Sequence, residues 1–358
     1  MNCGELYNNN GGNFFMIAAV LEAPRRMDLR EVEDPVCPEG GLLMKVEASS
    51  ICSTDIKMYE RGQRDLVYPR ILGHEISGVV FEEDGAGLQV GDRVQIYPGV
   101  YCGSCPYCRR KTENLCEGIR IIGFNLDGGF AEYLSVPEQS VKNGSVNPIP
   151  DGLDFEEAAL AEPLGCCINS QEMARVQDGD SVLIFGAGPA GLLHAMLARL
   201  RGASVVAAAE TLDSRARLAR SSADLVVNPD RDDLFYLGMD LTGGRGFDVI
   251  ILASRDVPVA SELFSLLAPR GRISLFSGLP PDLASASLDF NRLHYREHMI
   301  VGSYGCTPAQ NRKALELISG GMDVRRLITE RVSLRKIWRG MEHARGRRGL
   351  KAVVTDFG

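Results

Sequence analysis

Two kinds of hydrophobic pattern divide the chain. From about residue 14 to residue 151, short apolar stretches are interrupted by Gly and Pro. Three of these stretches, 41–46, 78–81 and 92–96, predict β-strands, because Gly-Asp and Pro turn signals flank them. This part of the chain is therefore expected to be an all-β unit with irregular loops.

The pattern changes near Asp180. Residues 181–185 (SVLIF) form a continuous apolar run, as expected for a strand buried on both faces of a parallel sheet. Further strands are predicted at 204–209, 248–252 and 272–276, with helices at 192–200, 213–222 and 261–268. Such alternation indicates βαβ units. The sheet is expected to end near 299–303, before a helix at 307–318 and a short strand at 352–354.

Length and composition narrow the function classes. The 358 residues are enough for two to three domains. The 39 basic and 47 acidic residues give a net charge of −8, which argues against a nucleic-acid-binding surface. The content of 45% hydrophobic and 24% charged residues is typical of a soluble globular protein. No apolar run reaches 18 residues, so no membrane span is expected.

The first residues carry no targeting pattern. Residues 1–12 are polar and rich in Asn, with no apolar core of a signal peptide. We expect residues 1–15 to be a flexible extension and the protein to be cytoplasmic. In that compartment the ten cysteines are expected to be thiols or metal ligands rather than disulfides.

Four cysteines lie close together in YCGSCPYCRRKTENLC: Cys102, Cys105, Cys108 and Cys116. Zinc takes four soft ligands in a tetrahedron, and short Cys-x-x-Cys loops can surround it. Four thiolates complete its coordination shell, so the pattern predicts a structural zinc site. Reduced, packed cysteines and a redox Cys-x-x-Cys pair are the alternatives; a redox pair, however, needs only two cysteines.

A second set of residues predicts an open metal site. Cys52, His74 and Glu75 combine a thiolate, an imidazole and a carboxylate, a mixture that suits zinc. Three protein ligands leave the fourth position for water or substrate. Asp55, three residues after Cys52, could orient the imidazole of His74. Glu162 is a second candidate carboxylate, unless it is only a solvated residue beside a Pro turn.

Gly186, Gly188, Pro189, Ala190 and Gly191 belong to a G-x-G-x-x-G turn. The turn follows a predicted strand and opens a predicted helix, which is the context of a dinucleotide-binding site. The first Gly makes the turn, the second admits the pyrophosphate, and the third lets the helix pack on the strand. The N–H groups of the helix N-terminus face the phosphate.

Glu210 ends the second strand of this unit, 24 residues after Gly186. A carboxylate there accepts hydrogen bonds from both ribose hydroxyls and repels a 2′-phosphate, so it favours NAD over NADP. Arg215 and Arg217 follow nearby. Both are expected on a solvated helix face, although Arg215 is retained as a candidate cofactor contact.

Together these motifs resemble the zinc-dependent medium-chain dehydrogenase/reductase family, and within it the sorbitol and threonine dehydrogenase branch. The resemblance runs from about Met16 to Val354. Its markers are Cys52-x-x-Asp55, GHE at 73–75, GDRV at 91–94, the four cysteines, DGGFAEY at 127–133, AEPL at 161–164 and GAGPAG at 186–191.

The resemblance implies a two-domain α/β protein. A GroES-like β-barrel catalytic domain is expected at 16–160 and 304–358, with a structural zinc lobe at about 101–117. A doubly wound Rossmann domain that binds NAD is expected at 161–303. The family also implies two zinc ions per chain, one catalytic and one structural, and a homodimer or homotetramer.

The resemblance also assigns site residues. Alcohol dehydrogenase binds its catalytic zinc with two Cys and one His, and here Glu162 stands at the position of the second Cys. Glu75 and Glu162 are therefore alternative third ligands. Thr54 matches the Ser/Thr that hydrogen-bonds the substrate hydroxyl. Lys57 stands where many relatives carry a proton-relay His; otherwise the proton leaves through water or the cofactor ribose.

The expected reaction is the reversible oxidation of a secondary alcohol to a ketone by hydride transfer to NAD. Replacing a thiolate ligand by a carboxylate makes the metal more electropositive, which favours a polyol or sugar alcohol as substrate. An L-threonine-type amino alcohol dehydrogenase is the alternative. A non-catalytic NAD-binding protein is a remote one, because no ligand is missing. A zinc-free quinone reductase would require that Cys52, His74 and the four cysteines bind nothing.

Overall fold

The structure, a computed structural model, describes residues 15–358 and divides them into two compact units. The first unit contains residues 15–162, 307–347 and 351–358, and the second contains 163–306 and 348–350. The expected flexible extension at 1–15 lies outside the described residues except for Phe15, which begins the first strand.

A seven-stranded sheet forms the centre of the first unit, and all of its pairings are antiparallel except that between the last two strands of the chain. Its strands are β10 (Val146–Pro148), β6 (Arg93–Ile96), β5 (Glu75–Glu83), β3 (Leu42–Ile51), β18 (Lys351–Asp356) and β17 (Ile328–Ser333), with β9 (Tyr133–Val136) paired to β3. The strands predicted at 41–46, 78–81 and 92–96 overlap β3, β5 and β6.

Smaller elements complete this unit. A second sheet contains β2 (Arg26–Glu33), β1 (Phe15–Ala23) and β4 (Arg70–Ile71), and a third pairs β7 (Gly99–Val100) with β8 (Arg120–Ile121). The helices are α2 (Ser53–Arg61), α3 (Pro106–Arg109), α4 (Glu138–Lys142), α5 (Phe155–Ala159), α11 (Pro308–Ser319) and α12 (Ile337–Arg345), with short 3₁₀ turns at Glu113–Leu115, Arg325–Leu327 and Leu334–Lys336.

The end of the chain returns to the first unit through β18. Residues 352–354 are fully buried, and Ala352 pairs with Ile51 of β3. This apolar run at the C-terminus therefore completes a sheet that begins some three hundred residues earlier. The pairing also brings the start of β18 next to the end of β3, where Cys52 follows.

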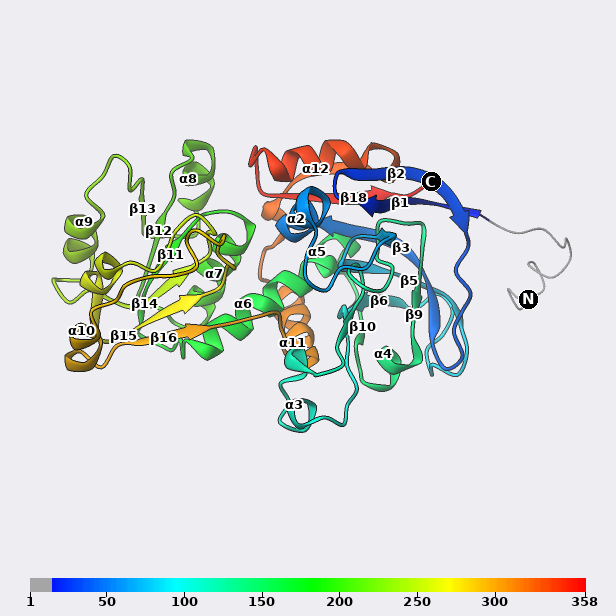
Figure 1. Ribbon diagram of the computed structural model, residues 1–358, viewed down its shortest axis with the longest axis horizontal. Coiled ribbons are helices and arrows are strands. Elements are labelled where there is room, and N and C mark those ends of the chain that lie inside the picture. Colours follow the sequence, from blue (N-terminus) through cyan, green and yellow to red (C-terminus); the bar gives the residue numbers. More distant parts are fainter. Residues whose placement is uncertain (1–14) are drawn as a thin grey trace, which may run out of the picture. The chain divides into compact units, whose positions relative to one another are not determined.

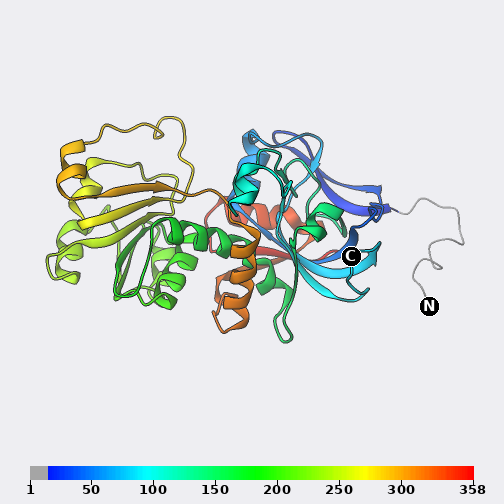
Figure 2. The same ribbon diagram turned by 90° about the horizontal axis from the view of Figure 1, so that it is seen from below.

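The second unit is a six-stranded, all-parallel sheet (Figures 1 and 2). Its spatial order is β13 (Leu225–Val227), β12 (Val205–Ala209), β11 (Ser181–Phe185), β14 (Phe247–Leu252), β15 (Leu267–Leu275) and β16 (Met299–Gly302). In chain order the strands run third, second, first, fourth, fifth, sixth, which is the doubly wound arrangement. The order reverses beside β11, and ligands of such sheets bind at that point.

Both faces of this sheet are buried. Along β11, Leu183 and Phe185 pack into one apolar cluster, and Val182 and Ile184 pack into another. Successive side chains of a strand point to opposite faces. A strand with apolar residues at successive positions, such as 182–185, therefore needs a cover on each side, as the sequence predicted.

The helices of the second unit are α7 (Pro189–Leu200), α8 (Asp213–Ala219), α9 (Leu234–Leu241) and α10 (Phe290–Tyr295), and α6 (Ala161–Met173) begins just before it. The prediction of a helix at 261–268 is wrong. Only a short 3₁₀ turn, Ser261–Ser265, forms there, because Leu267 already pairs with Phe247 of β14. Among residues 15–358, no helix has the length and hydropathy needed to cross a bilayer.

Candidate metal and nucleotide sites

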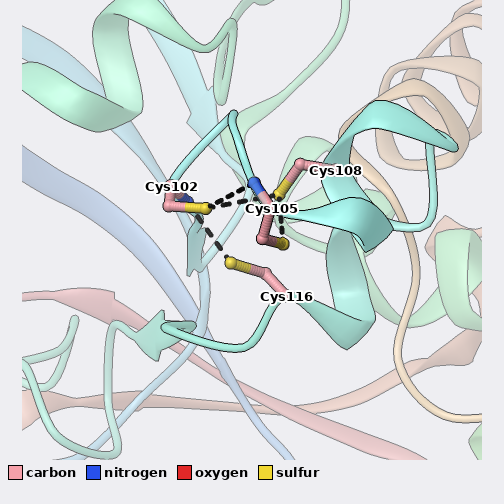
Figure 3. A group of neighbouring side chains, drawn as sticks. All are labelled: Cys102, Cys105, Cys108 and Cys116. Carbon is pink, nitrogen blue, oxygen red and sulfur yellow. Dashed lines mark hydrogen bonds between the residues drawn. The ribbon is translucent and has the colours of Figure 1, made fainter.

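The side chains of Cys102, Cys105, Cys108 and Cys116 point toward a common centre (Figure 3). Their four sulfur atoms lie within 4.8 Å of one another. The Sγ atoms of Cys105 and Cys108 are 3.5 Å apart, and those of Cys102 and Cys108 are 3.9 Å apart. The loop between β7 and β8 thus gathers four thiols in one place, and this arrangement matches the four-ligand shell of a structural zinc ion.

Backbone N–H groups favour the charged form of some of these thiols. The Sγ of Cys102 accepts hydrogen bonds from the backbone nitrogens of Ser104 (3.4 Å) and Cys105 (3.3 Å), and these bonds lower the pKa of Cys102 to about 6. Burial instead raises the pKa of Cys108 to about 12. A cation bound among the four sulfurs would supply the charge that makes all four thiolates favourable.

A second group joins Cys52, His74 and Glu75, whose ligand atoms also lie within 4.8 Å of one another. Cys52 follows β3 and caps α2, whereas His74 and Glu75 stand at the start of β5. Because β3 and β5 are antiparallel partners, with Ser50 opposite Glu75, the end of one strand meets the start of the other. His74 is 5% exposed and Glu75 is fully buried.

Asp55 lies between two members of this group. Its Oδ2 accepts a hydrogen bond from the backbone nitrogen of Cys52 at 2.8 Å, and its Oδ1 is 3.3 Å from Nδ1 of His74. Burial lowers the pKa of His74, but the neighbouring Asp55 and Cys52 outweigh burial and raise it well above its ordinary value. The structure therefore places Asp55 where it can orient the imidazole ring.

Lys351 is the site residue that the sequence did not reveal. Its Nζ is 2.5 Å from Oε1 of Glu75 and also contacts Oε2, and the lysine is only 4% exposed. Burial disfavours its charge, but Glu75, Cys52 and Glu162 outweigh burial and raise the pKa of Lys351. The local sequence signal of this buried ion pair is a lysine between two apolar residues, Leu350 and Ala352.

The remaining candidates lie on two helices. Thr54 is half-buried in the first turn of α2, and Lys57 is exposed one turn later. Glu162 stands in the first turn of α6, not in a Pro turn, because proline at the next position is tolerated in the first turn of a helix. Glu162 does not belong to the group formed by Cys52, His74 and Glu75, but its charge acts on Lys351.

In the second unit, the glycine turn connects β11 to α7. Gly186 has a φ of +97°, which L side chains rarely adopt. A Cβ on Gly191 would lie only 1.8 Å from the carbonyl oxygen of Gly186, so no side chain fits at the helix start. Gly188 caps α7, and Pro189 and Ala190 begin its first turn. The turn thus places the N-terminus of α7 at the point where the strand order reverses.

Glu210 and Arg215 border this turn. Oε2 of Glu210 accepts a hydrogen bond from the backbone nitrogen of Ala187 at 2.9 Å, and Oε1 accepts one from that of Leu212 at 2.9 Å. Arg217 is exposed, as expected of a solvated helix face, but Arg215 is not on such a face. Its Nε donates to the carbonyl oxygen of Gly349 at 3.1 Å, and its Nη1 lies 3.1 Å from the position that a Cβ on Gly188 would take.

Comparisons with known proteins agree with this geometry. Residues 38–150 match the alcohol dehydrogenase GroES-like domain, and residues 189–320 match the zinc-binding dehydrogenase domain. The chain is 39% identical over 287 residues to the L-threonine 3-dehydrogenase of Pyrococcus abyssi (strain GE5 / Orsay), covering 78% of this chain and 79% of that one. The chain belongs to the zinc-dependent medium-chain dehydrogenases.

Other members of this dehydrogenase family are similar along nearly the whole chain. The D-arabitol-phosphate dehydrogenase of Enterococcus avium is 31% identical over 325 residues, covering 88% of this chain and 89% of that one. A zinc-binding dehydrogenase from Sinorhizobium meliloti 1021, solved with bound NADP, superposes with a TM-score of 0.87 and 31% identity and covers 96% of this chain and 99% of its own.

Membership of the family confirms three predictions made from the sequence. The fold class is a GroES-like domain combined with a Rossmann sheet. The protein is an oxidoreductase of the zinc-dependent alcohol dehydrogenase type. Zinc and a nicotinamide dinucleotide are the cofactors expected of such an enzyme.

Proposed function

We propose that this dehydrogenase oxidises a secondary alcohol to a ketone, reversibly, at the group formed by Cys52, His74 and Glu75. The convergence of these three ligand atoms within 4.8 Å carries the proposal. A thiolate, an imidazole and a carboxylate form a donor set that suits zinc. When bound there, zinc polarises the alcohol oxygen as a Lewis acid, and the nicotinamide ring supplies the hydride acceptor.

The protein's own residues hold this site in shape. Asp55 fixes the amide of Cys52 and the ring of His74, so both ligands keep their direction when substrate exchanges. Lys351 holds both carboxylate oxygens of Glu75. We propose Cys52 and His74 as permanent ligands, and Glu75 and Glu162 as alternative third ligands, with Lys351 determining how readily Glu75 is released.

The proton of the alcohol needs a route to solvent. Thr54 is half-buried on α2, two residues after Cys52, and we propose that its hydroxyl accepts the substrate proton as it donates its own onward. Lys57 lies three residues later on the same helix and is exposed. Residues three apart are neighbours on a helix surface, so Lys57 stands at the solvent end of this route.

The dinucleotide site favours NAD in our proposal. Gly186, Gly188 and Gly191 admit the pyrophosphate to the N-terminus of α7. The carboxylate of Glu210, held by two backbone N–H groups, would accept the ribose hydroxyls and repel a 2′-phosphate. Arg215 beside Gly188 lies where it could contact the phosphates. Steady-state kinetics with NAD and NADP test this choice directly.

The substrate is proposed to be a secondary alcohol with a second polar group on the neighbouring carbon. A polyol or sugar alcohol is the first candidate, because a carboxylate ligand in place of a thiolate leaves the metal harder. L-threonine is the second, because its dehydrogenase from Pyrococcus abyssi is 39% identical to this chain. NADH formation measured over sugar alcohols, cyclic polyols, L-threonine and simple secondary alcohols distinguishes them. Equal turnover of a monohydric alcohol and a polyol would contradict the role given to the carboxylate.

We further propose a second, structural zinc ion at Cys102, Cys105, Cys108 and Cys116. The first unit would be the catalytic domain and the second the NAD-binding domain, in line with the family matches at 38–150 and 189–320. A homodimer or homotetramer in the cytoplasm completes the proposal. Light scattering of the purified protein tests the assembly, and cell fractionation tests the location.

A further inference from the structure

Two cysteines outside both ligand groups lie close to each other. Cys166 is on α6, and Cys306 follows β16, far along the sequence but within the same unit. Their Sγ atoms lie within 4.8 Å of each other. Cys166 is partly exposed, whereas Cys306 is 2% exposed. Neither residue has a role in the proposed reaction.

Hydrogen bonds connect the two segments that carry these cysteines. Asn169, one helical turn after Cys166, donates from Nδ2 to the carbonyl oxygens of Gly305 at 2.9 Å and Tyr304 at 3.4 Å. The residue immediately before Cys306 is thus fixed to α6. These hydrogen bonds fix α6 against the segment after β16, so the backbone segments that carry Cys166 and Cys306 stay close to each other.

We propose that Cys166 and Cys306 are a modification site: an oxidisable dithiol that closes into a reversible disulfide. Rotation about the side-chain bonds must shorten the separation of the sulfurs to about 2.05 Å. The partly exposed Cys166 meets the oxidant first, and the buried Cys306 resolves the product. Accessible cysteines with a neighbouring thiol are the ones that behave in this way.

Closing the disulfide removes two electrons from the two thiols, and a peroxide is the oxidant that accepts them. The sulfur of Cys166 attacks one oxygen of hydrogen peroxide, the O–O bond breaks, and a sulfenic acid and water form. The sulfur of Cys306 then attacks the sulfenic sulfur. The S–S bond forms while the hydroxyl leaves with the thiol proton as a second water. Two electrons pass from the two thiols to the peroxide, and a dithiol reductant reverses the change.

The position of the pair gives the disulfide a consequence. The chain enters the second unit after Glu162 and leaves it after Cys306. A Cys166–Cys306 bond would therefore tie together two of the segments through which the chain passes from one unit to the other. It would also restrain the first turns of α6, which carry Glu162. If Glu162 acts as proposed above, oxidation lowers turnover severalfold and reduction restores it.

Peptide mapping tests the bond without relying on activity. The zinc-loaded protein is treated with stoichiometric hydrogen peroxide, digested without reductant and analysed by mass spectrometry. We expect a linked pair of peptides containing Cys166 and Cys306 that separates on adding dithiothreitol. Oxidation of Cys166 to a sulfinic acid without this link would overturn the proposal.

Neighbouring cysteine variants give the controls. Cys167, adjacent to Cys166, is buried and its Sγ lies 3.7 Å from the carbonyl oxygen of Ala190. We expect C167S to form the link and C166S and C306S to lose it. A link that persists in C166S would assign the chemistry to Cys167 and contradict us. Turnover that falls equally in C306S would show that oxidation acts elsewhere, at Cys52 or the zinc lobe.

Metal analysis separates a disulfide from a third metal site. The thiols of Cys166 and Cys306 and the carboxylate of Glu162 could also bind a soft cation. We expect the same zinc content in the wild type, C306S and C166S. A third metal ion that is present in the wild type and lost in C306S would replace the disulfide proposal with a metal site.

Discussion

The ammonium of Lys351 lies 2.5 Å from Oε1 of Glu75 in a place that solvent does not reach, since the two side chains are 4% and 0% exposed. Lys351 begins the last strand of the chain, and Glu75 begins the fifth. This ion pair therefore ties the returning C-terminal segment to the proposed zinc ligands.

Removing one partner of this pair should destabilise the protein. In Lys351→Met the Glu75 carboxylate stays buried without its cation, which costs about 3–5 kcal/mol. The double variant Lys351→Met/Glu75→Gln should recover most of that loss, because no unpaired charge remains. Urea unfolding of the metal-free proteins measures both, because zinc bound at Glu75 would replace the missing cation. A double variant no more stable than the single one would show that the ion pair is not the source of the effect.

The zinc lobe should act on folding rather than on chemistry. Cys116→Ser removes one of four ligands, so we expect one zinc ion to be lost per chain. The midpoint of thermal unfolding should fall by roughly 10 °C, since several kcal/mol of metal binding disappear. Cys37→Ser is the matched control, because Cys37 belongs to neither ligand group. Unchanged metal content in Cys116→Ser would refute the structural zinc site.

His194 should make stability depend on pH. It is fully buried, and burial lowers its pKa to about 3. In the unfolded chain, His194 has the ordinary pKa of about 6.5. Between pH 6.5 and pH 3, His194 is therefore protonated in the unfolded chain and neutral in the folded protein. The contribution of His194 to the free energy of unfolding is thus fully present above pH 6.5. It falls on acidification by roughly 1.4 kcal/mol per pH unit.

The matched variants isolate this effect. His194→Gln should flatten the fall in unfolding free energy between pH 6.5 and 5, whereas His294→Gln, at an exposed position, should not. Comparing each variant with the wild type at the same pH removes any common contribution from metal loss. Parallel profiles for His194→Gln and the wild type would contradict the burial argument.

Glu210 should determine the preference for NAD. In Glu210→Gln the charge that we propose accepts the ribose hydroxyls is lost, so KM for NAD should rise about tenfold while kcat changes little. The value of kcat/KM for NADP should increase, because the 2′-phosphate is no longer repelled by a negative charge. Arg217→Gln, on the exposed side of α8, serves as the control. A wild-type enzyme that prefers NADP would overturn the role of Glu210.

Cys52 should be needed for turnover and not for the fold. Cys52→Ala should retain the zinc of the lobe, lose the other and slow NADH formation about a thousandfold, because several kcal/mol of charge stabilisation disappear. Circular dichroism should match that of the wild type. Full turnover in Cys52→Ala would refute the catalytic site, whereas a lost fold would be seen in the spectrum.

Local patterns were enough to predict much of this protein. The all-buried β11 and the glycine turn after it are contiguous in sequence, so their structure follows from neighbours alone. The four-cysteine lobe is likewise a single short loop. Cys52, His74 and Glu75 were predicted from their donor types and from the Cys52-x-x-Asp55 and GHE motifs, although only the pairing of β3 with β5 places them together.

Other features depend on contacts that no local pattern contains. Lys351 faces Glu75 only because β18 pairs with β3, and that register is set by the buried Ala352 and Ile51. The helix predicted at 261–268 failed because Leu267 gains more by pairing with β14. Arg215 was expected in solvent, but its partner Gly349 comes from the far end of the chain.

The most direct test is anomalous X-ray diffraction at the zinc absorption edge, from a crystal grown with zinc and NAD. We predict two zinc peaks per chain: one among Cys102, Cys105, Cys108 and Cys116, and one at about 2.3 Å from Sγ of Cys52 and about 2.1 Å from a ring nitrogen of His74. A single peak at the four cysteines, with none between Cys52 and His74, would contradict the proposed catalytic centre.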